Sequence, residues 1–278
     1  MKKIVILGAG GQLGKDLLQT FPDAYAFYHD SSKKLSIDIT RKNEVSEKIL
    51  GISPDVIINA SAMTNVDLCE KEKKSAFLVN GQSVKYIVDA ARRTHAFLVH
   101  VSTDYIFDGY QGEYDEDAIP NPINYYGLSK LVGETYANSY ENSLILRTSG
   151  VYGRINNFPV FVYNQLLKGN AVKAIKGYYS PIHSANLAKC IYYLVGLERT
   201  GTLNVAGVRI SRYEFARKIA EKFGFDVSLI NEIENTNSMT ARRPFDSSLN
   251  IEKAKTVLDF DFYSTESNLN LFSRYLIQ

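Results

Sequence analysis

Tyr126 and Lys130 stand four residues apart in the run NYYGLSK (124–130). On a helix, side chains four positions apart lie on the same face, so the ammonium of Lys130 can lie near the phenol of Tyr126. Such a charge would favour the phenolate and lower a pKa that is normally about 10. A tyrosine tuned in this way can act as an acid near neutral pH. The hydroxyl pair Ser102-Thr103, which ends an apolar segment upstream, completes a set of groups able to protonate a carbonyl oxygen.

A glycine-rich turn follows the first apolar segment, in the run GAGGQLG (8–14). Its glycines fit the spacing G-x-x-G-x-x-G at Gly8, Gly11 and Gly14, whereas G-x-G-x-x-G fails because Leu13 occupies the last position. Glycine permits positive φ and close backbone approach, and the N-terminus of the next helix offers free N–H groups to a pyrophosphate. A glycine turn can also join a strand to a helix without any ligand. Its place between a predicted strand and a predicted helix favours nucleotide binding.

Further contacts to a dinucleotide are expected where later strands end, because ligands of open α/β sheets lie at the carboxyl ends of the strands. The pair Asp38-Ile39 and the run NASAMT (59–64) occupy such places. Ala60 and Ala62 are small enough to let a dinucleotide lie against the backbone. Small residues also pack sheets, so their size alone favours neither role.

The choice of dinucleotide depends on the run YHDSSKK (28–34), which follows the second predicted strand. It offers both an aspartate and two lysines. Lys33 or Lys34 could pair with a 2′-phosphate, although solvated loop lysines are the simpler interpretation. We expect NADP(H), with NAD(H) as the alternative.

Five short apolar segments alternate with amphipathic stretches over the first half of the chain. Strands are predicted at 4–7, 24–28, 55–58, 97–101 and 143–146, and helices at 12–20, 41–50, 74–93 and 125–139. Near-continuous apolar strands separated by helices are typical of a parallel sheet covered on both faces. The sequence therefore predicts an α/β fold, a doubly wound parallel sheet of the Rossmann kind.

The pattern is less regular beyond about residue 149. Helices are predicted at 158–168, 184–197 and 211–223, and the polar run 231–240 is interpreted as a surface loop. We expect a dinucleotide-binding domain over 1–149 and a smaller substrate-binding lobe over 150–278. Because the apolar spacing of 182–197 is typical of a helix that covers a sheet, 182–200 is expected to return to the first domain.

Composition excludes several classes of protein. The 278 residues carry a formal net charge of +2 and no long basic run, so neither nucleic acid nor an anionic membrane is the expected partner. Cys69, Cys190 and the four histidines show no metal-ligand spacing, and we expect two reduced thiols and no metal. Only about five apolar residues follow the N-terminal MKK, too few for a signal peptide or a membrane span, so we expect a cytoplasmic protein.

Together these motifs resemble the extended short-chain dehydrogenase/reductase superfamily and, within it, the dTDP-4-dehydrorhamnose reductase family. The resemblance covers nearly the whole chain and is most specific in the run STDYIFDG (102–109). The other runs that carry it are GQLG (11–14), NASAMT (59–64), YGLSK (126–130), RTS (147–149), SRYEFA (211–216) and ARRP (241–244). The family delivers hydride from a nicotinamide to a sugar 4-ketone, and its tyrosine gives a proton to the developing alkoxide.

By this resemblance the chain would be an NAD(P)H-dependent reductase of a nucleotide-activated 4-keto sugar, most simply of dTDP-4-dehydro-L-rhamnose to dTDP-L-rhamnose in dTDP-rhamnose biosynthesis. A homodimer is compatible with it. Thr103, Tyr126 and Lys130 would be catalytic, since Thr103 can donate a hydrogen bond to the carbonyl oxygen. The dinucleotide site would comprise Gly8, Gly11, Gln12, Leu13, Gly14, Asp38, Ile39, Ala60, Ala62, Met63, Thr64, Val101, Tyr126 and Lys130. The sugar nucleotide would contact Thr103, Asp104, Tyr126, Gly150 and Arg243.

The chain departs from the family pattern at two places. Gly150 follows RTS where the family has a tryptophan that packs near the sugar, and this chain contains no tryptophan. The run KGYYSPIH (176–183) stands where the family usually has an Asp-Gln pair and a Pro-Thr pair. The identity of the nucleotide-sugar is therefore left open, and the tyrosines of this run are alternative stacking residues.

Two other functions also stay open. One is a non-catalytic NADP-binding regulatory subunit, because the β subunit of methionine adenosyltransferase resembles this family and serves a partner protein. The other is a sugar-nucleotide dehydratase, but that class usually has Thr-Asp-Glu where this chain has Thr103-Asp104-Tyr105, and so the glutamate for the extra proton is missing. The reductase is favoured because Thr103, Tyr126 and Lys130 are all present.

Overall fold

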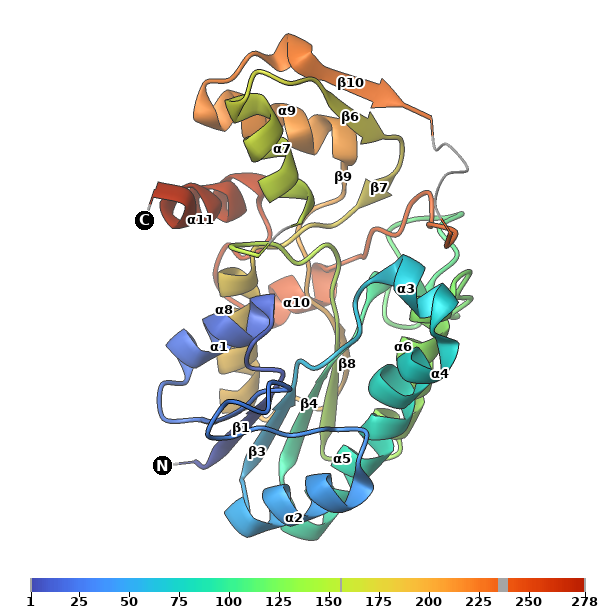
Figure 1. The fold of residues 1–278 in the computed structure, drawn as a ribbon, viewed down its shortest axis with the longest axis vertical. Helices are drawn as coiled ribbons and strands as arrows, with labels where there is room; N and C mark the ends of the chain where they lie inside the picture. Colours follow the sequence, from blue (N-terminus) through green and yellow to red (C-terminus); the bar gives the residue numbers. More distant parts are fainter. Residues whose placement is uncertain (1, 156, 235–239, 278) are drawn as a thin grey trace.

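A computed structural model of the chain describes residues 2–155, 157–234 and 240–277. Its centre is a sheet of six parallel strands in the order β2-β1-β3-β4-β5-β8 (Figure 1). The order reverses at β1, which pairs with β2 on one side and with β3 on the other. Ligands of such sheets bind at the carboxyl edge, beside the reversal. The six strands are β1 (Ile4–Leu7), β2 (Tyr25–Phe27), β3 (Val56–Asn59), β4 (Phe97–Val101), β5 (Ser143–Arg147) and β8 (Gly201–Asn204).

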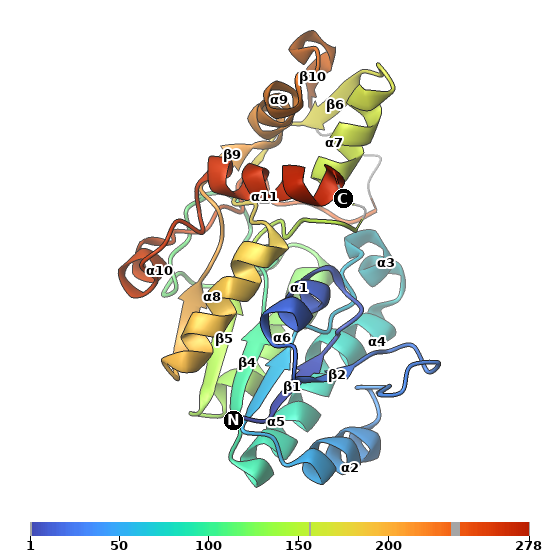
Figure 2. The same cartoon turned by 90° about the vertical axis from the view of Figure 1, so that its left-hand side faces the viewer.

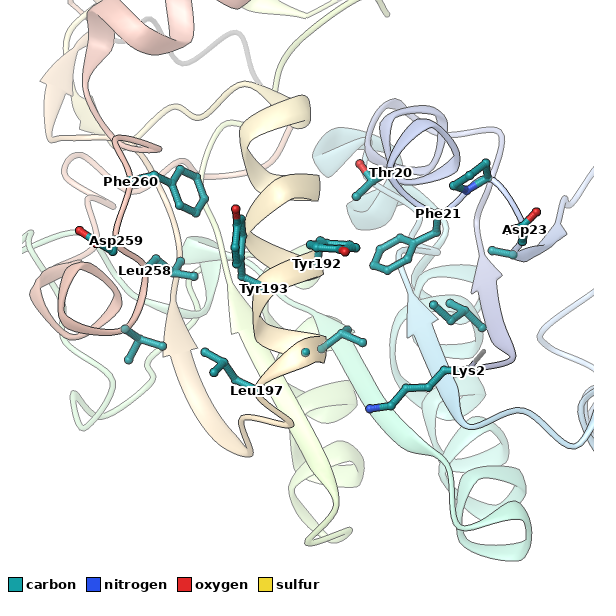
Figure 3. Close-up of a pocket in the computed structure, with 16 residues that line it drawn as sticks. Lys2, Thr20, Phe21, Asp23, Tyr192, Tyr193, Leu197, Leu258, Asp259 and Phe260 are labelled. Carbon is teal, nitrogen blue, oxygen red and sulfur yellow. The ribbon is translucent and has the colours of Figure 1, made fainter.

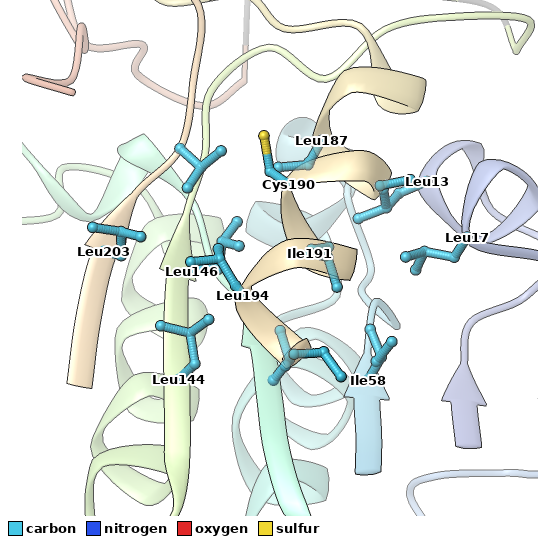
Figure 4. Packing of buried hydrophobic residues seen from close by; sticks show 14 of the residues in the cluster. Leu13, Leu17, Ile58, Leu144, Leu146, Leu187, Cys190, Ile191, Leu194 and Leu203 are labelled. Carbon is cyan, nitrogen blue, oxygen red and sulfur yellow. The ribbon is translucent and has the colours of Figure 1, made fainter. Parts of the chain in front are cut away.

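Helices cover both faces of the sheet, which is why its central strands β1, β3 and β4 are mainly apolar. On one face, Leu17 of α1 and Ile191 of α8 pack with Ile58 and Leu146 of the sheet (Figure 4). On the other face, α2, α5 and α6 cover the alternate side chains of the same strands. These helices are α1 (Gln12–Thr20), α2 (Lys42–Ile52), α5 (Ser83–Thr94), α6 (Tyr125–Asn138) and α8 (Ser184–Gly196).

The predicted helix 74–93 is divided in the structure. It begins as α4 (Lys73–Ala76), continues as the π-helical turn η1 (Phe77–Gln82) and then becomes α5. A π-helical turn inserts an extra residue into the helix, and such turns often occur at functional sites. The remaining short helices of the first domain are α3 (Val66–Lys71) and the 3₁₀ turn η2 (Asp104–Ile106).

A smaller lobe lies beyond the carboxyl edge of the sheet (Figures 1 and 2). Its own core includes Tyr152, Val162, Phe215 and Phe272. The strands pair as β6 with β10, in parallel, and β7 with β9, antiparallel. The elements are α7 (Phe158–Leu167), β6 (Val172–Ile175), β7 (Tyr178–Tyr179), β9 (Ile210–Ser211), α9 (Arg212–Phe223), η3 (Val227–Leu229), β10 (Ile230–Ile233) and α11 (Thr265–Ile277).

The first domain takes more of the chain than the sequence predicted. β8 lies just beyond the segment 182–200 and joins the sheet as its sixth strand, paired with β5. Ala254 of α10 (Glu252–Val257) and the nearby Phe262 pack into the same apolar cluster as α1 and α8. The strand was not predicted because its sequence GTLN contains only one large apolar residue, Leu203, and so forms no apolar run. We therefore propose that the first domain comprises 1–149 and 182–200 together with β8 and α10.

The predicted loop at 231–240 is wrong at its start. Residues Asn231, Glu232 and Ile233 belong to β10, because pairing with β6 overrides their polar composition. Residues 235–239 lie outside the described part of the chain. Within the described ranges, no helix is both long and apolar enough to cross a membrane.

Candidate active site

Most of the predicted site residues line one cleft between the carboxyl edge of the sheet and the smaller lobe. The cleft has a volume of about 590 Å³. One side comes from the segments that follow β1, β3, β4 and β5, and the other from α7, β7 and α9. The predicted residues in its lining are Gly11, Gln12, Leu13, Ala60, Ala62, Thr64, Val101, Thr103, Asp104, Tyr126, Lys130 and Gly150.

A second hollow, of about 840 Å³, contains none of the predicted site residues. It lies between the end of α1 and the last turns of α8, with Phe21, Tyr192, Tyr193 and Phe260 in its wall (Figure 3). Its wall is mainly apolar and, although it contains the phenols of Tyr192 and Tyr193, it includes no residue of the glycine turn. The candidate active site is therefore the smaller cleft, which adjoins that turn.

The glycine turn is built by close backbone contacts. Gly8 has φ +85°, and a Cβ atom on it would lie 2.8 Å from the backbone nitrogen of Ser61. A Cβ atom on Gly14 would lie 2.2 Å from the backbone oxygen of Gly8. Neither Gly8 nor Gly14 lines the cleft, so both act by bringing β1, β3 and α1 together. Gly11, the N-cap residue of α1, is the glycine that faces the cleft.

The segment after β3 is held by Asn80, a residue of η1 that no sequence motif indicates. Its side chain accepts a hydrogen bond from the backbone N–H of Met63 at 2.8 Å and donates one to the backbone oxygen of Met63 at 3.1 Å. It also donates to Ser129 Oγ at 3.0 Å. Met63 itself is not among the residues that line the cleft, and its predicted contact with the dinucleotide stays a prediction. Asn80 ties the segment that lines the cleft to α6, which carries Tyr126.

Asp38 and Ile39 were predicted at the dinucleotide site, but neither lines the cleft. Ile39 is buried in the core under α2. Asp38 accepts hydrogen bonds from Thr40 and pairs with Arg41 at 3.2 Å. Burial acts to raise the pKa of Asp38, but the Thr40 bonds and the Arg41 charge outweigh it, and the pKa is lowered. The carboxylate is therefore engaged at the start of α2.

Tyr126 and Lys130 lie one turn apart at the start of α6 and both line the cleft. The helix begins here because Asn124 caps it, accepting a hydrogen bond from the backbone N–H of Gly127 at 2.8 Å. Lys130 is only 2% exposed, and its Nζ donates to the backbone oxygen of Val101 at 2.6 Å. Burial lowers the pKa of Lys130 from 10.5 to about 8, although the nearby Glu134 carboxylate opposes the shift.

The sequence predicted a lowered pKa for Tyr126, and that prediction is wrong. Burial raises the pKa of the Tyr126 phenol above its usual value of 10, and the Asp104 charge adds to the increase. The Thr103 hydroxyl only partly offsets these effects. Because Lys130 donates to Val101 instead of the phenol, desolvation decides the result. The phenol is consequently protonated at neutral pH.

Thr103 and Asp104 belong to a buried network of hydroxyl groups. Asp104 Oδ2 accepts hydrogen bonds from Ser149 at 2.7 Å and from Ser247 at 2.5 Å, and Asp104 Oδ1 accepts one from Thr103 at 3.0 Å. Burial raises the pKa of Asp104, while the three hydroxyl donors act to lower it. Since Ser247 comes from the C-terminal quarter of the chain, the network also orients Thr103 relative to the smaller lobe.

Arg243, which the sequence predicted to contact the sugar nucleotide, is not among the residues that line the cleft. Its guanidinium donates to Asp67 Oδ2 at 2.9 Å and to the backbone oxygen of Ala241 at 3.1 Å. The pair with Asp67 fixes the ARRP segment against α3. Arg212 is the arginine that lines the cleft, together with Tyr179. Sequence alone could not separate these arginines, because the pairing of β7 with β9 decides which one faces the cleft.

The described residues contain no cluster of three or more His, Cys, Asp or Glu side chains placed to hold a metal ion. Cys69 and Cys190 are both buried and free. Burial of Cys69 raises the pKa of its thiol to about 11, so it is a thiol at neutral pH.

The residues present fit a dinucleotide. The cleft begins at the N-terminus of α1, where backbone N–H groups can bind phosphate. The side-chain hydroxyls of Ser102 and Thr148, which also line the cleft, are buried and have no hydrogen-bond partner among the described residues. Polar groups buried without a partner are costly, so such hydroxyls favour a polar ligand.

The fold and the cleft define a class: a Rossmann protein with a dinucleotide-type glycine turn and a Thr-Tyr-Lys set at the carboxyl edge of its sheet. Within this class, the family model described as the RmlD substrate binding domain matches residues 1–275. The chain therefore belongs to this family.

Relatives named for one reaction are similar to this chain over nearly its full length. The chain is 34% identical to a dTDP-4-dehydrorhamnose reductase of Aggregatibacter actinomycetemcomitans, over 91% of this chain and 92% of the relative. A solved structure of a hypothetical dTDP-4-dehydrorhamnose reductase from Sulfolobus tokodaii is 45% identical with a TM-score of 0.89, and covers 94% of this chain and 96% of its own. The enzyme from Bacillus anthracis, solved in complex with NADP, is 30% identical with a TM-score of 0.89 and covers 99% of both chains.

The regulatory protein considered above is a more distant relative. The chain is 26% identical to the methionine adenosyltransferase 2 subunit beta of Bos taurus, over 92% of this chain and 82% of the relative. The dTDP-4-dehydrorhamnose reductase of Aggregatibacter actinomycetemcomitans is thus more similar to this chain than the regulatory subunit is.

Proposed function

We propose that the protein is an NAD(P)H-dependent reductase of the 4-keto group of a nucleotide-activated sugar, most simply of dTDP-4-dehydro-L-rhamnose to dTDP-L-rhamnose. The observation that carries the proposal is that Thr103, Tyr126 and Lys130 line one cleft with the glycine turn of the dinucleotide type. Membership of the RmlD family, whose relatives include enzymes named for this reaction, supports it.

Tyr126 is the proton donor in this proposal. Its raised pKa keeps the phenol protonated at neutral pH, so a proton is available for an alkoxide that develops on the sugar. The Thr103 hydroxyl lies beside it, held by Asp104, and turns to donate a hydrogen bond to the same oxygen. Asp104 keeps its bonds from Ser149 and Ser247 during that movement.

Lys130 supplies charge at the step that leaves a phenolate. Its pKa of about 8 keeps it largely protonated at neutral pH, one helical turn from Tyr126. When the phenol gives up its proton, a negative charge appears in a buried site, and the Lys130 ammonium offsets it. The bond to Val101 holds the ammonium under the cleft.

A nicotinamide cofactor, when bound, supplies the hydride for the reduction. Gly11, Gln12 and Leu13 at the start of α1 would hold its pyrophosphate, and Ala60 and Ala62 leave room for the dinucleotide against the sheet.

We also propose a preference for NADPH over NADH. Lys33 Nζ lies 6.0 Å from the ring centroid of Tyr28, and that ring lies 3.5 Å from the position of a Cβ atom on Gly10. The lysine is thus carried next to the glycine turn, where it can pair with a 2′-phosphate. Asp38, which was predicted at the dinucleotide site, is already engaged by Thr40 and Arg41.

The Tyr126→Phe variant tests the enzymatic function. NADPH oxidation is followed with dTDP-4-dehydro-L-rhamnose generated in situ, and kcat is expected to fall by roughly 10²- to 10⁴-fold because the proton donor is lost. Dinucleotide affinity stays near the wild-type value, since the glycine turn is unchanged. Tyr125→Phe is the matched control, because Tyr125 is the neighbouring tyrosine and does not line the cleft.

Three outcomes would count against the proposal. Turnover by Tyr126→Phe at the wild-type rate would remove the proton donor from the mechanism. Equal losses of kcat and of dinucleotide affinity would indicate a structural role. A wild-type protein that binds NADP tightly, reduces no sugar nucleotide and copurifies with a partner would be a regulatory subunit. Light scattering on the same preparations distinguishes a monomer from the homodimer that we leave open.

A further inference from the structure

Tyr179 and Arg212 form part of the cleft wall that comes from the smaller lobe. β7 and β9 pair antiparallel with Tyr179 opposite Ile210, which brings Arg212, the first residue of α9, beside Tyr179. The guanidinium carbon of Arg212 lies 4.8 Å from the centroid of the Tyr179 ring. This distance is within the range of a cation–π contact, so the ring fixes the position of the positive charge.

Gly150 makes this position of the tyrosine available. It has φ +51°, and a Cβ atom on it would lie 2.7 Å from both Cδ2 and Cε2 of Tyr179. The ring therefore occupies the space that any side chain at position 150 would need. A tryptophan at this position, which the family pattern predicts, could not coexist with Tyr179 as it lies here. The absence of the tryptophan at position 150 and the placement of the Tyr179 ring therefore depend on each other.

Arg212 has no carboxylate partner, whereas two other arginines near the cleft do. Arg147 pairs with Glu134 and Arg243 pairs with Asp67. No carboxylate among the described residues lies within 4.0 Å of the Arg212 guanidinium, and the Tyr179 hydroxyl, on a side chain only 7% exposed, has no hydrogen-bond partner there either. Both groups therefore offer hydrogen-bond donors to a ligand in the cleft.

The distance from the proton donor suits an anion at the far end of a hexose. Burial raises the pKa of the Tyr105 phenol, and the nearby Arg212 charge opposes that increase. The Tyr105 ring packs edge to face on Tyr126 with centroids 5.9 Å apart. Arg212 is consequently about one aromatic ring away from Tyr126. In a 4-keto sugar nucleotide, the sugar ring separates the reacting 4-oxygen from the anomeric diphosphate. A cation for that diphosphate must lie at such a separation.

We propose that Arg212 binds the diphosphate of the nucleotide-sugar substrate, with Tyr179 holding the guanidinium and Gly150 leaving space for the tyrosine ring. The inference rests on the proposed function. A guanidinium suits a diphosphate because its planar set of N–H donors can bind two oxygens at once. The pyrophosphate of the dinucleotide has its own site at the start of α1, in the other domain, so Arg212 is left for the sugar nucleotide (Figure 1).

The test compares Arg212→Gln with Arg217→Gln, an arginine of the same helix that pairs with Glu221 at 3.7 Å on the surface. Charge-assisted hydrogen bonds contribute about 1.5–3 kcal/mol, so Arg212→Gln is expected to raise the KM for dTDP-4-dehydro-L-rhamnose by roughly 10- to 100-fold. The kcat and the KM for NADPH change little. Calorimetric titration with dTDP in the presence of saturating NADP⁺ should show a matching loss of affinity. Arg217→Gln behaves as the wild type, and Arg212→Lys recovers part of the loss.

Gly150→Ala tests the position of the cation without changing its charge. The added Cβ displaces the Tyr179 ring, so the variant should also bind dTDP more weakly while a thermal melt shows that it is folded. An unchanged dTDP affinity in Arg212→Gln would overturn the inference. So would a rise in the KM for NADPH in place of that for the sugar, because Arg212 would then belong to the dinucleotide subsite.

The two proposals fail separately in these measurements. If the wild type reduces no sugar nucleotide, the proposed function fails, and the dTDP titration still decides the role of Arg212. Weaker dTDP binding by Arg212→Gln than by the wild type would support the diphosphate site. Equal binding by both, or no binding by the wild type, would overturn it.

Discussion

Replacing Lys130 by methionine is expected to stabilise the protein at pH 7 while abolishing its activity. Lys130 is 2% exposed, and burial lowers its pKa from 10.5 to about 8. A shift of one pKa unit corresponds to about 1.4 kcal/mol, so holding the charged lysine in the folded protein costs about 3 kcal/mol. Methionine removes that cost and fills a similar volume. It also leaves the Val101 oxygen without the Lys130 bond, a loss of about 1 kcal/mol. The expected net gain is about 2 kcal/mol.

The gain depends on pH in a direction that follows from the lowered pKa. Below about pH 8 the lysine is charged in both the folded and the unfolded states, and the wild type bears the full cost. Between about 8 and 10.5 the unfolded chain binds the proton that the folded protein has released, so the stability of the wild type rises with pH. The advantage of Lys130→Met therefore shrinks over this range. Above about pH 10.5, the lysine is neutral in both states. Lys130→Met is then less stable than the wild type by the free energy of the lost hydrogen bond to Val101.

Urea denaturation at pH 7 and at pH 10 measures the free energy of unfolding of the variant and of the wild type. The difference between the two is compared at each pH, because contributions from the titration of other groups are the same in both proteins. Lys85→Met is the control, because Lys85 is exposed on α5, and its difference should be near zero at both pH values. A Lys130→Met variant that is less stable than the wild type at pH 7 would refute the reasoning. An advantage of the same size at pH 7 and pH 10 would refute it as well, since desolvation of the charge would not be its source.

Two further predictions concern the dinucleotide and the support of α6. Lys33→Gln should lower kcat/KM for NADPH and leave that for NADH unchanged, as measured by separate oxidation assays; equal effects on both would remove Lys33 from the 2′-phosphate. Arg147→Met should lower the free energy of unfolding by about 3–5 kcal/mol in urea, because it leaves the buried Glu134 carboxylate without its partner at 3.0 Å. Adding Glu134→Gln to Arg147→Met should recover most of that loss. If Arg147→Met alone were as stable as the wild type, the expectation would be wrong.

Much of the site could be predicted from sequence because its signals are local. The strands Ile4–Leu7 and Phe97–Val101 have the bounds expected from their apolar runs, and the helix Gln12–Thr20 has the bounds expected from its amphipathic pattern. Tyr126 and Lys130 line the same cleft, as four-residue spacing on a helix requires. The residues of the cleft were harder to predict where distant segments meet. Asn80 was missed because nothing in its neighbourhood indicates that it binds the Met63 backbone.

The order of apolar segments and the glycine turn determined the Rossmann sheet, since hydrophobic periodicity and backbone freedom are properties of neighbouring residues. The tertiary structure alone decided that Arg212 faces the cleft while Arg243 pairs with Asp67, because that depends on which strands of the smaller lobe pair. It also decided the direction of the Tyr126 pKa shift. A pKa is set by how much water remains around the group, and that is fixed only when distant parts of the chain close over it.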